Sequence, residues 1–328
     1  MRFSEETKSL VIGEPLTAGQ LKPIRDILPV TAEAWERLRL VFQHDVTIGT
    51  GATPVALGGF HYLKNIILKT SMAEYPFNLP GMGFYYLNLF LQGKKPFYDS
   101  ILASDGKYQN TIDLPFNLDF LWYKDDLLLQ TKDYSHLELQ IQCGSLSDLY
   151  DAPGTATDTP TVDLTVVRSK NPFIKEQEEK AKKKRAMIYV KRQAPFNPSS
   201  QPYVLFERAD DLALFGFLMI AHEDSTPGVP FSGTPADILN KITFKDNLMP
   251  FLEDGTIGHF KSERQKLMGN SGASLTGIYP YLFSQDGSIF SAYGCAKKSE
   301  IRIDIQEIIG SPTDPQVDVI VFGMRSLR

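Results

Sequence analysis

The segment Tyr62-Leu-Lys-Asn-Ile-Ile-Leu-Lys69 occurs a second time, in altered form, as Ile238-Leu-Asn-Lys-Ile-Thr-Phe-Lys245. Two more segments recur in the same order: Leu137-Glu-Leu-Gln-Ile-Gln142 as Ile301-Arg-Ile-Asp-Ile-Gln306, and Val162-Asp-Leu-Thr-Val-Val167 as Val317-Asp-Val-Ile-Val-Phe322. Apolar residues alternate with polar ones through much of these segments, as in strands with one buried face. A period of roughly 160 residues is far longer than solenoid periods of about 20–50, so we interpret the repeat as a domain duplicated within one chain.

The composition agrees with two β domains. A chain of 328 residues is long enough for about two domains, each with its own core. Hydrophobic residues make up 42% and charged residues 22%, which is ordinary for a soluble globular protein. The 21 Phe and 14 Tyr residues favour strands, while 24 Gly and 21 Pro residues favour turns, so the balance predicts an all-β chain.

Charge and cysteine content argue against several classes of protein. The formal net charge of −5 is unlike that of a dedicated nucleic-acid binder, which normally carries a basic domain or stripe. Cys143 and Cys295 lie in different halves without a Cys-x-x-Cys spacing, so we interpret them as buried free thiols. The first residues lack the apolar core of a signal peptide, and the longest apolar stretch, residues 212–221, is too short to span a membrane. We therefore expect synthesis in the cytoplasm without membrane insertion.

The repeat divides the chain into four parts. Residues 1–36 read as an N-terminal arm, 37–170 as the first repeat, 171–211 as a connector and 212–328 as the second repeat. Thr31 is placed to cap a short helix at the end of the arm. Arms of this kind either order against a neighbouring subunit or remain partly ordered termini, and the sequence leaves both alternatives open.

The connector contains a predicted surface helix. Residues 175–185 combine strong helix formers with almost nothing but charge, and Glu176 with Lys180 forms a helical i,i+4 pair. Such a helix has no apolar face, so it would lie on the surface or bridge two domains. The basic run that begins at Lys180 and ends at Arg185 either meets nucleic acid or anionic lipid, or is a solvated face.

Each half offers seven or eight alternating segments separated by loops of very uneven length. Uneven connections are typical of Greek-key sandwiches rather than simple meanders, and eight strands in two sheets make a jelly roll. The sequence therefore predicts an all-β fold of two tandem eight-stranded jelly rolls joined by a helical connector. Residues 212–221 are apolar almost throughout, as in a strand covered on both faces.

The sequence shows no pattern of catalytic, cofactor-binding or metal-binding residues. The five histidines occur without a His-x-His or His-Glu-x-x-His spacing; they are His44, His61, His136, His222 and His259. His44 and His222 fall at similar points of the two repeats, where we expect a structural role at a strand end. Asp148, Asp151 and Asp158 lie in an acidic loop that either binds calcium or is solvated.

A cluster of aromatic residues allows two interpretations. Either their rings form a platform on which a sugar or a base stacks, or they pack in the core or against another subunit. These residues are Phe84, Tyr85, Tyr86, Phe116, Phe120, Trp122 and Tyr123.

Taken together, these features resemble the double jelly-roll major capsid proteins of tail-less icosahedral viruses, many with an internal membrane, among them lipid-containing bacteriophages. The resemblance is carried by Gly58-Gly-Phe-His-Tyr-Leu-Lys-Asn-Ile-Ile-Leu68 with its counterpart in residues 238–244, and by the closing segments 162–167 and 317–322. It covers residues 37–328 and rests on a pattern of strands, without an invariant motif. The charged connector helix departs from it.

The resemblance implies a non-enzymatic capsid protein that forms homotrimers, in which six jelly rolls make a pseudo-hexameric tile. It implies a virion location after synthesis in the host cytoplasm, and contact with neighbouring trimers and with vertex or minor capsid proteins. The N-terminal arm would reach toward an internal membrane, and no specific nucleic-acid site is evident. The alternative is a tandem β-sandwich carbohydrate-binding or cupin-like protein, which the aromatic richness and the generality of the fold favour.

Overall fold

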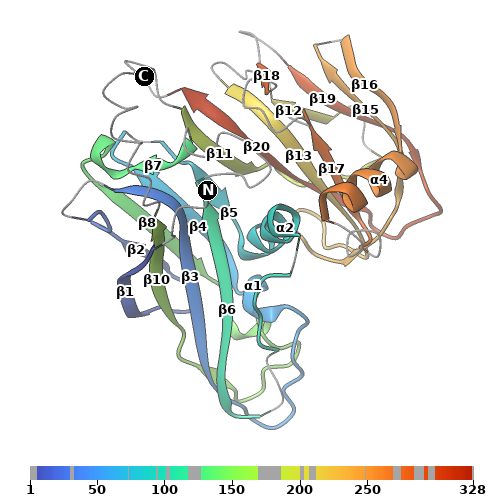
Figure 1. Ribbon diagram of the computed structural model, residues 1–328. Helices are drawn as coiled ribbons and strands as arrows, with labels where there is room; N and C mark the ends of the chain where they lie inside the picture. Colours follow the sequence, from blue (N-terminus) through green and yellow to red (C-terminus); the bar gives the residue numbers. More distant parts are fainter. Residues whose placement is uncertain are drawn as a thin grey trace. The chain divides into compact units, whose positions relative to one another are not determined.

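The structure is a computed structural model of the chain (Figure 1). It describes residues 6–29, 33–72, 74–93, 95–100, 104–116, 127–168, 186–199, 203–206, 212–247, 249–268, 275–283, 292–294 and 300–326. The chain divides into two units. The first comprises Met1–Leu89, Lys95–Leu118 and Lys124–Met187, and the second comprises Phe90–Lys94, Asp119–Tyr123 and Ile188–Arg328. Strands account for 52% and helices for 14%, so the all-β prediction is confirmed.

The first unit contains two antiparallel sheets of four main strands each. One sheet has the order β1-β10-β3-β6, formed by β1 (Glu6–Pro15), β10 (Thr161–Arg168), β3 (Ala34–Thr47) and β6 (Gly106–Pro115). The other has the order β5-β4-β8-β2, formed by β5 (Phe77–Leu79), β4 (Leu63–Thr70), β8 (Leu137–Cys143) and β2 (Leu21–Ile24). Two short strands, β7 (Leu129–Gln130) and β9 (Thr157–Asp158), pair with β3.

The second unit repeats this arrangement. One sheet places β20 (Gln316–Ser326) between β11 (Ala186–Arg192) and β13 (Leu212–Glu223), and β13 also pairs with β17 (Ile278–Leu282), β14 (Thr234–Pro235) and β18 (Tyr293–Gly294). The other has the order β12-β19-β15-β16, formed by β12 (Tyr203–Phe206), β19 (Ile301–Ile308), β15 (Leu239–Asp246) and β16 (Met249–Thr256).

The two units have the same strand order when their strands are matched by their sequence along the chain. The order β1-β10-β3-β6 corresponds to β11-β20-β13-β17, and β2-β8-β4-β5 corresponds to β12-β19-β15-β16. The three recurring segments of the sequence lie on β4 and β15, on β8 and β19, and on β10 and β20. The prediction of two tandem eight-stranded jelly rolls is therefore confirmed, and the duplication extends to the eight main strands of each unit.

The predicted arm is wrong for the described part of residues 1–36, because β1 pairs with β10 and β2 pairs with β8. The connector 171–211 likewise supplies β11 and β12, so arm and connector are counterparts of one another. Both β1 and β2 are edge strands of the sheets as ordered above. Polar residues such as Lys8 and Glu14 interrupt the alternation of apolar residues from which a strand could have been predicted. Thr31 and the predicted helix 175–185, with its basic run from Lys180 to Arg185, lie outside the described residues.

Helices occupy equivalent places in the two units. α2 (Gly81–Gln92) connects β5 to β6, and α4 (Ile257–Met268) connects β16 to β17. The aromatic residues Phe84, Tyr85 and Tyr86 thus lie on a helix, which is buried from Gly81 to Phe90 because nearly every face of it is apolar. One short helix, α1 (Gly58–His61), and two 3-10 turns, η2 (Thr131–Asp133) and η3 (Leu146–Asp148), lie in loops of the first unit. Among the described residues, no helix is long and apolar enough to cross a membrane.

β13 is deeply buried in the second unit. Leu214, Phe217 and Met219 belong to the core between the two sheets, and the neighbouring residues Phe215 and Leu218 are buried as well. The prediction that residues 212–221 are covered on both faces is therefore confirmed. Fully burying such side chains contributes about 1.5–3 kcal/mol each.

Gly216 allows β13 to approach its neighbours closely. A Cβ at this position would lie 2.3 Å from the carbonyl oxygen of Tyr281 and 2.9 Å from Cδ2 of Leu282. The backbone oxygen cannot move aside without breaking the β13–β17 ladder, so any side chain here must displace a strand.

We expect Gly216→Val to lower the free energy of unfolding by about 2 kcal/mol or more, because overpacking a rigid core forces the backbone to shift. Gly258→Ala is the control, since its nearest neighbour would be 3.7 Å away. Urea denaturation followed by circular dichroism measures both. Equal stability of the two variants would contradict the expected clash.

Candidate functional site

The five histidines do not come together. His44 lies on β3 and His222 on β13, whereas His61 is in α1, His136 precedes β8 and His259 is in α4. Within the described ranges, no group of three or more His, Cys, Asp or Glu residues is arranged to hold a metal ion. The predicted absence of a metal site remains a prediction, because Cys295 and other residues lie outside those ranges.

His44 forms a buried pair with Asp158 at one end of the first unit. Its Nδ1 lies 2.8 Å from Oδ2 of Asp158, and the two side chains are only 2% and 3% exposed. The ring packs edge-on against Tyr62, with centroids 5.3 Å apart. The pair links β3 to β9, the short strand that leads into β10. It therefore holds the end of β3 beside the start of β10, the two inner strands of the order β1-β10-β3-β6.

Tyr62 also contacts Cys143, which is a buried free thiol as predicted. Burial raises the pKa of the Cys143 thiol to about 12, and burial also raises the pKa of Tyr62. A thiol with a raised pKa carries little thiolate at neutral pH and is a poor nucleophile. Both side chains are buried, so we interpret their contact as core packing.

The second unit has its own buried pair at the corresponding strand. Nδ1 of His222 lies 3.7 Å from Oδ2 of Asp318, and both side chains are fully buried. Asp318 accepts a hydrogen bond from the backbone N–H of Phe231 at 2.8 Å and lies 3.8 Å from Arg192 of β11. Burial raises the pKa of Asp318 to about 6, because the ionised carboxylate is poorly solvated there.

His44 and His222 therefore occupy equivalent strands, and each faces a carboxylate near the start of its unit's last long strand, β10 or β20. This geometry supports the structural role that the sequence predicted for both histidines. Sequence reasoning missed their partners, because Asp158 and Asp318 lie far along the chain and no local spacing connects them.

The acidic loop does not gather its carboxylates at one point. Asp148 is 2.5 Å from Nζ of Lys64 and closes a capping box with Ser145 at η3. Asp158 is engaged by His44, and Asp151 is exposed. Among the described residues these carboxylates thus form no calcium cluster.

The described aromatic residues of the proposed platform are core residues. Phe84, Tyr85, Tyr86 and Phe116 are at most 8% exposed, so their ring faces are not available for stacking on a sugar or base. Phe77 packs against both Phe84 and Phe116, with centroids 6.1 and 5.7 Å away. The core interpretation is confirmed for these four; Phe120, Trp122 and Tyr123 lie outside the described residues.

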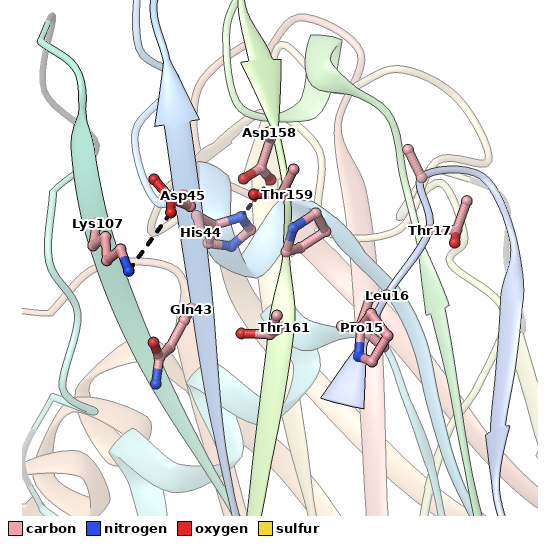
Figure 2. Close-up of a pocket in the computed structure, with 12 residues that line it drawn as sticks. Pro15, Leu16, Thr17, Gln43, His44, Asp45, Lys107, Asp158, Thr159 and Thr161 are labelled. Atoms are coloured by element: carbon pink, nitrogen blue, oxygen red, sulfur yellow. Dashed lines mark hydrogen bonds and ion pairs between the residues drawn. The ribbon is translucent and has the colours of Figure 1, made fainter. Parts of the chain in front are cut away.

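A pocket of about 520 Å³ opens at the same end of the first unit as His44 and Asp158 (Figure 2). Its walls come from four separate places, which are residues 15–18, residues 43–45, Lys107 and residues 158–161. No sequence motif predicts this pocket, because each segment of the chain contributes only one to four residues and the fold alone brings them together.

The fold relates the chain to solved structures. No model of a known protein family matches the chain, and no curated protein matches it in sequence. The structure matches the major capsid protein P2 from bacteriophage PM2 at 13% identity, over 99% of this chain and 98% of that chain, with a TM-score of 0.61.

It also matches the major capsid protein of Sulfolobus Turreted Icosahedral Virus at 13% identity, over 98% of this chain and 97% of that chain, with a TM-score of 0.68. A third match, VP54 of PBCV-1, has 10% identity over 98% of this chain and 94% of that chain, with a TM-score of 0.63.

The chain has the double jelly-roll fold of viral major capsid proteins. At 10–13% identity the likeness is one of fold, and it extends over nearly the whole length of both chains. The double jelly roll includes β1 and β2, so the resemblance is wider than the residues 37–328 from which the sequence suggested it.

The raised pKa of Asp318 predicts a pH-dependent stability. The folded state keeps a proton on Asp318 that the unfolded chain loses between pH 3.8 and about 6, so this residue's contribution to stability falls as pH rises through that window. The Asp318→Asn variant cannot ionise at this position and escapes that loss. The difference in free energy of unfolding between the variant and the parent should therefore shift in the variant's favour by up to roughly 3 kcal/mol from pH 4 to pH 7. Urea denaturation at several pH values measures the difference. Parallel pH profiles would contradict the assignment.

The buried pair of the first unit should show strong coupling. Removing one partner leaves a buried polar group unsatisfied, so His44→Leu and Asp158→Leu should be non-additive by about 1–3 kcal/mol in a double-mutant cycle. The exposed pair Asp45–Lys107, whose charged atoms are 3.7 Å apart, is the control and should couple by about 1 kcal/mol or less. Chemical denaturation of the single and double variants supplies the values. Additivity at His44 and Asp158 would refute a buried interaction.

Proposed function

We propose that this protein is the major capsid protein of an icosahedral virus and that it assembles as pseudo-hexameric trimers. The observation that carries the proposal is the pair of eight-stranded jelly rolls in one chain, matched over 98–99% of its length to capsid proteins. Three chains supply six jelly rolls, so a cyclic trimer is a unit suited to six-fold lattice positions. The work of such a protein is association, in which burial of surface between copies replaces chemistry.

The proposed location is the virion, after synthesis in the host cytoplasm. The proposed partners are other copies of this chain within and between trimers, and vertex or minor capsid proteins. An internal membrane remains a proposed partner, but residues 6–15 and 21–24 are committed to sheets and would have to leave them to act as a reaching arm. We propose no enzymatic activity and no specific nucleic-acid site.

The oligomeric state tests the proposal. We expect the purified chain to elute as a species of three times its 36.8 kDa mass in size-exclusion chromatography with light scattering. Electron microscopy of the concentrated protein should show triangular or pseudo-hexagonal particles, and sheets or shells under assembly conditions. A protein that stays monomeric at every concentration and salt condition, without shells, would overturn the proposal.

A further inference from the structure

The pocket of the first unit lies over two rows of side chains on one sheet. Pro15, Thr161 and Gln43 are direct neighbours across β1, β10 and β3, and Asp45 faces Lys107 across β3 and β6. Side chains directly opposite in antiparallel strands project from the same face, so these five residues form one surface. Figure 2 shows them around the hollow, with the Asp45–Lys107 ion pair at its side.

Hydrogen bonds between backbones hold the walls of the pocket in place. The N–H of Leu16 donates to the carbonyl oxygen of Pro160 at 2.9 Å, and the N–H of Thr159 donates to that of Asp45 at 3.1 Å. Gln43 is oriented by donating through Nε2 to Asp163 at 3.2 Å, which leaves its Oε1 as an acceptor. The pocket is thus built on paired strands, and at about 520 Å³ it falls within the ~300–1,000 Å³ of small-molecule sites.

The buried pair His44–Asp158 lies behind this surface. His44 and Val46 alternate with Gln43 and Asp45 along β3, and Val46 is the neighbour of Asp158 across β3 and β9, so the pair projects from the opposite, core-facing side of the sheet. Its two side chains are only 2% and 3% exposed, so they support the pocket from behind and do not contact a ligand.

The remaining chemistry of the lining favours a neutral ligand rich in hydroxyl groups. Thr17, Thr159 and Thr161 each offer a hydroxyl that donates and accepts. The charges at the rim, Asp45 and Lys107, already pair with one another, so neither an anion nor a cation finds an unpaired counter-charge there. Pro15 is exposed and supplies aliphatic surface on which the C–H face of a sugar ring can rest.

We propose that this pocket is a binding site for a neutral sugar residue, held by the threonine hydroxyls, Gln43 and the Asp45–Lys107 pair. The site is independent of the buried aromatic residues considered above as a platform. It adds a recognition function to the chain and does not rest on the capsid assignment, because every residue it uses belongs to the first unit.

Saturation-transfer NMR of the purified full-length protein tests the site. The probes are methyl glycosides of glucose, galactose, mannose and N-acetylglucosamine, with sialic acid, acetate and a primary amine as charged comparisons. We expect at least one neutral glycoside to bind with a dissociation constant on the order of 1 mM. Thr161→Val and Lys107→Met should each weaken that binding about tenfold, since each removes a hydrogen-bonding group with little change of shape.

Two control variants separate the site from the general surface. Thr111→Val alters another half-buried threonine of the same sheet, and Lys64→Met alters a paired lysine; neither residue lines the pocket. Both should bind sugar as the parent does. The proposal is overturned if no neutral glycoside binds at ~50 mM, if binding survives both pocket variants, or if the charged probes bind in preference. Light scattering on the same samples reports assembly separately, so a negative titration leaves the capsid proposal untouched.

Discussion

The structure depends on the last long strand of each unit pairing on both sides at once. β10 bonds to β1 and to β3, and β20 stands between β11 and β13. These partners come from the beginning of each unit, so the sheet cannot close until almost the whole unit has been made. Ordering so much chain before such distant contacts form is entropically costly, and the fold repays that cost through deeply buried strands such as β13.

The strands that the recurring segments of the sequence predicted have neighbours on both sides. β4, β8 and β10 alternate clearly, because one face meets the core, and their counterparts repeat the pattern. β1 and β2 end their sheets and keep Lys8, Glu14 and Pro23 at positions where an internal strand would carry apolar or hydrogen-bonding residues, so they read as an arm. The pocket and the His44–Asp158 pair were beyond prediction, because they join residues that only the closed sandwich brings together.

The two units share a topology but differ in the contacts of their buried histidines. In the first, His44 contacts its carboxylate at 2.8 Å, whereas in the second His222 stands 3.7 Å from Asp318, which also accepts from a backbone N–H and faces Arg192. The two histidines thus occupy equivalent strands, but the carboxylate partner lies on β9 in the first unit and on β20 in the second.

The irregular first strand has a consequence for how copies of this chain meet at high concentration. The register of β1 against β10 shifts twice, between Ser9 and Val11 and between Val11 and Glu14, and Pro23 interrupts the donor row of β2. A broken row of donors and acceptors is a poor template for a foreign strand. Copies at high concentration would then contact one another through side chains instead of adding strands to one another's sheets. This disfavours fibril formation and still permits ordered association.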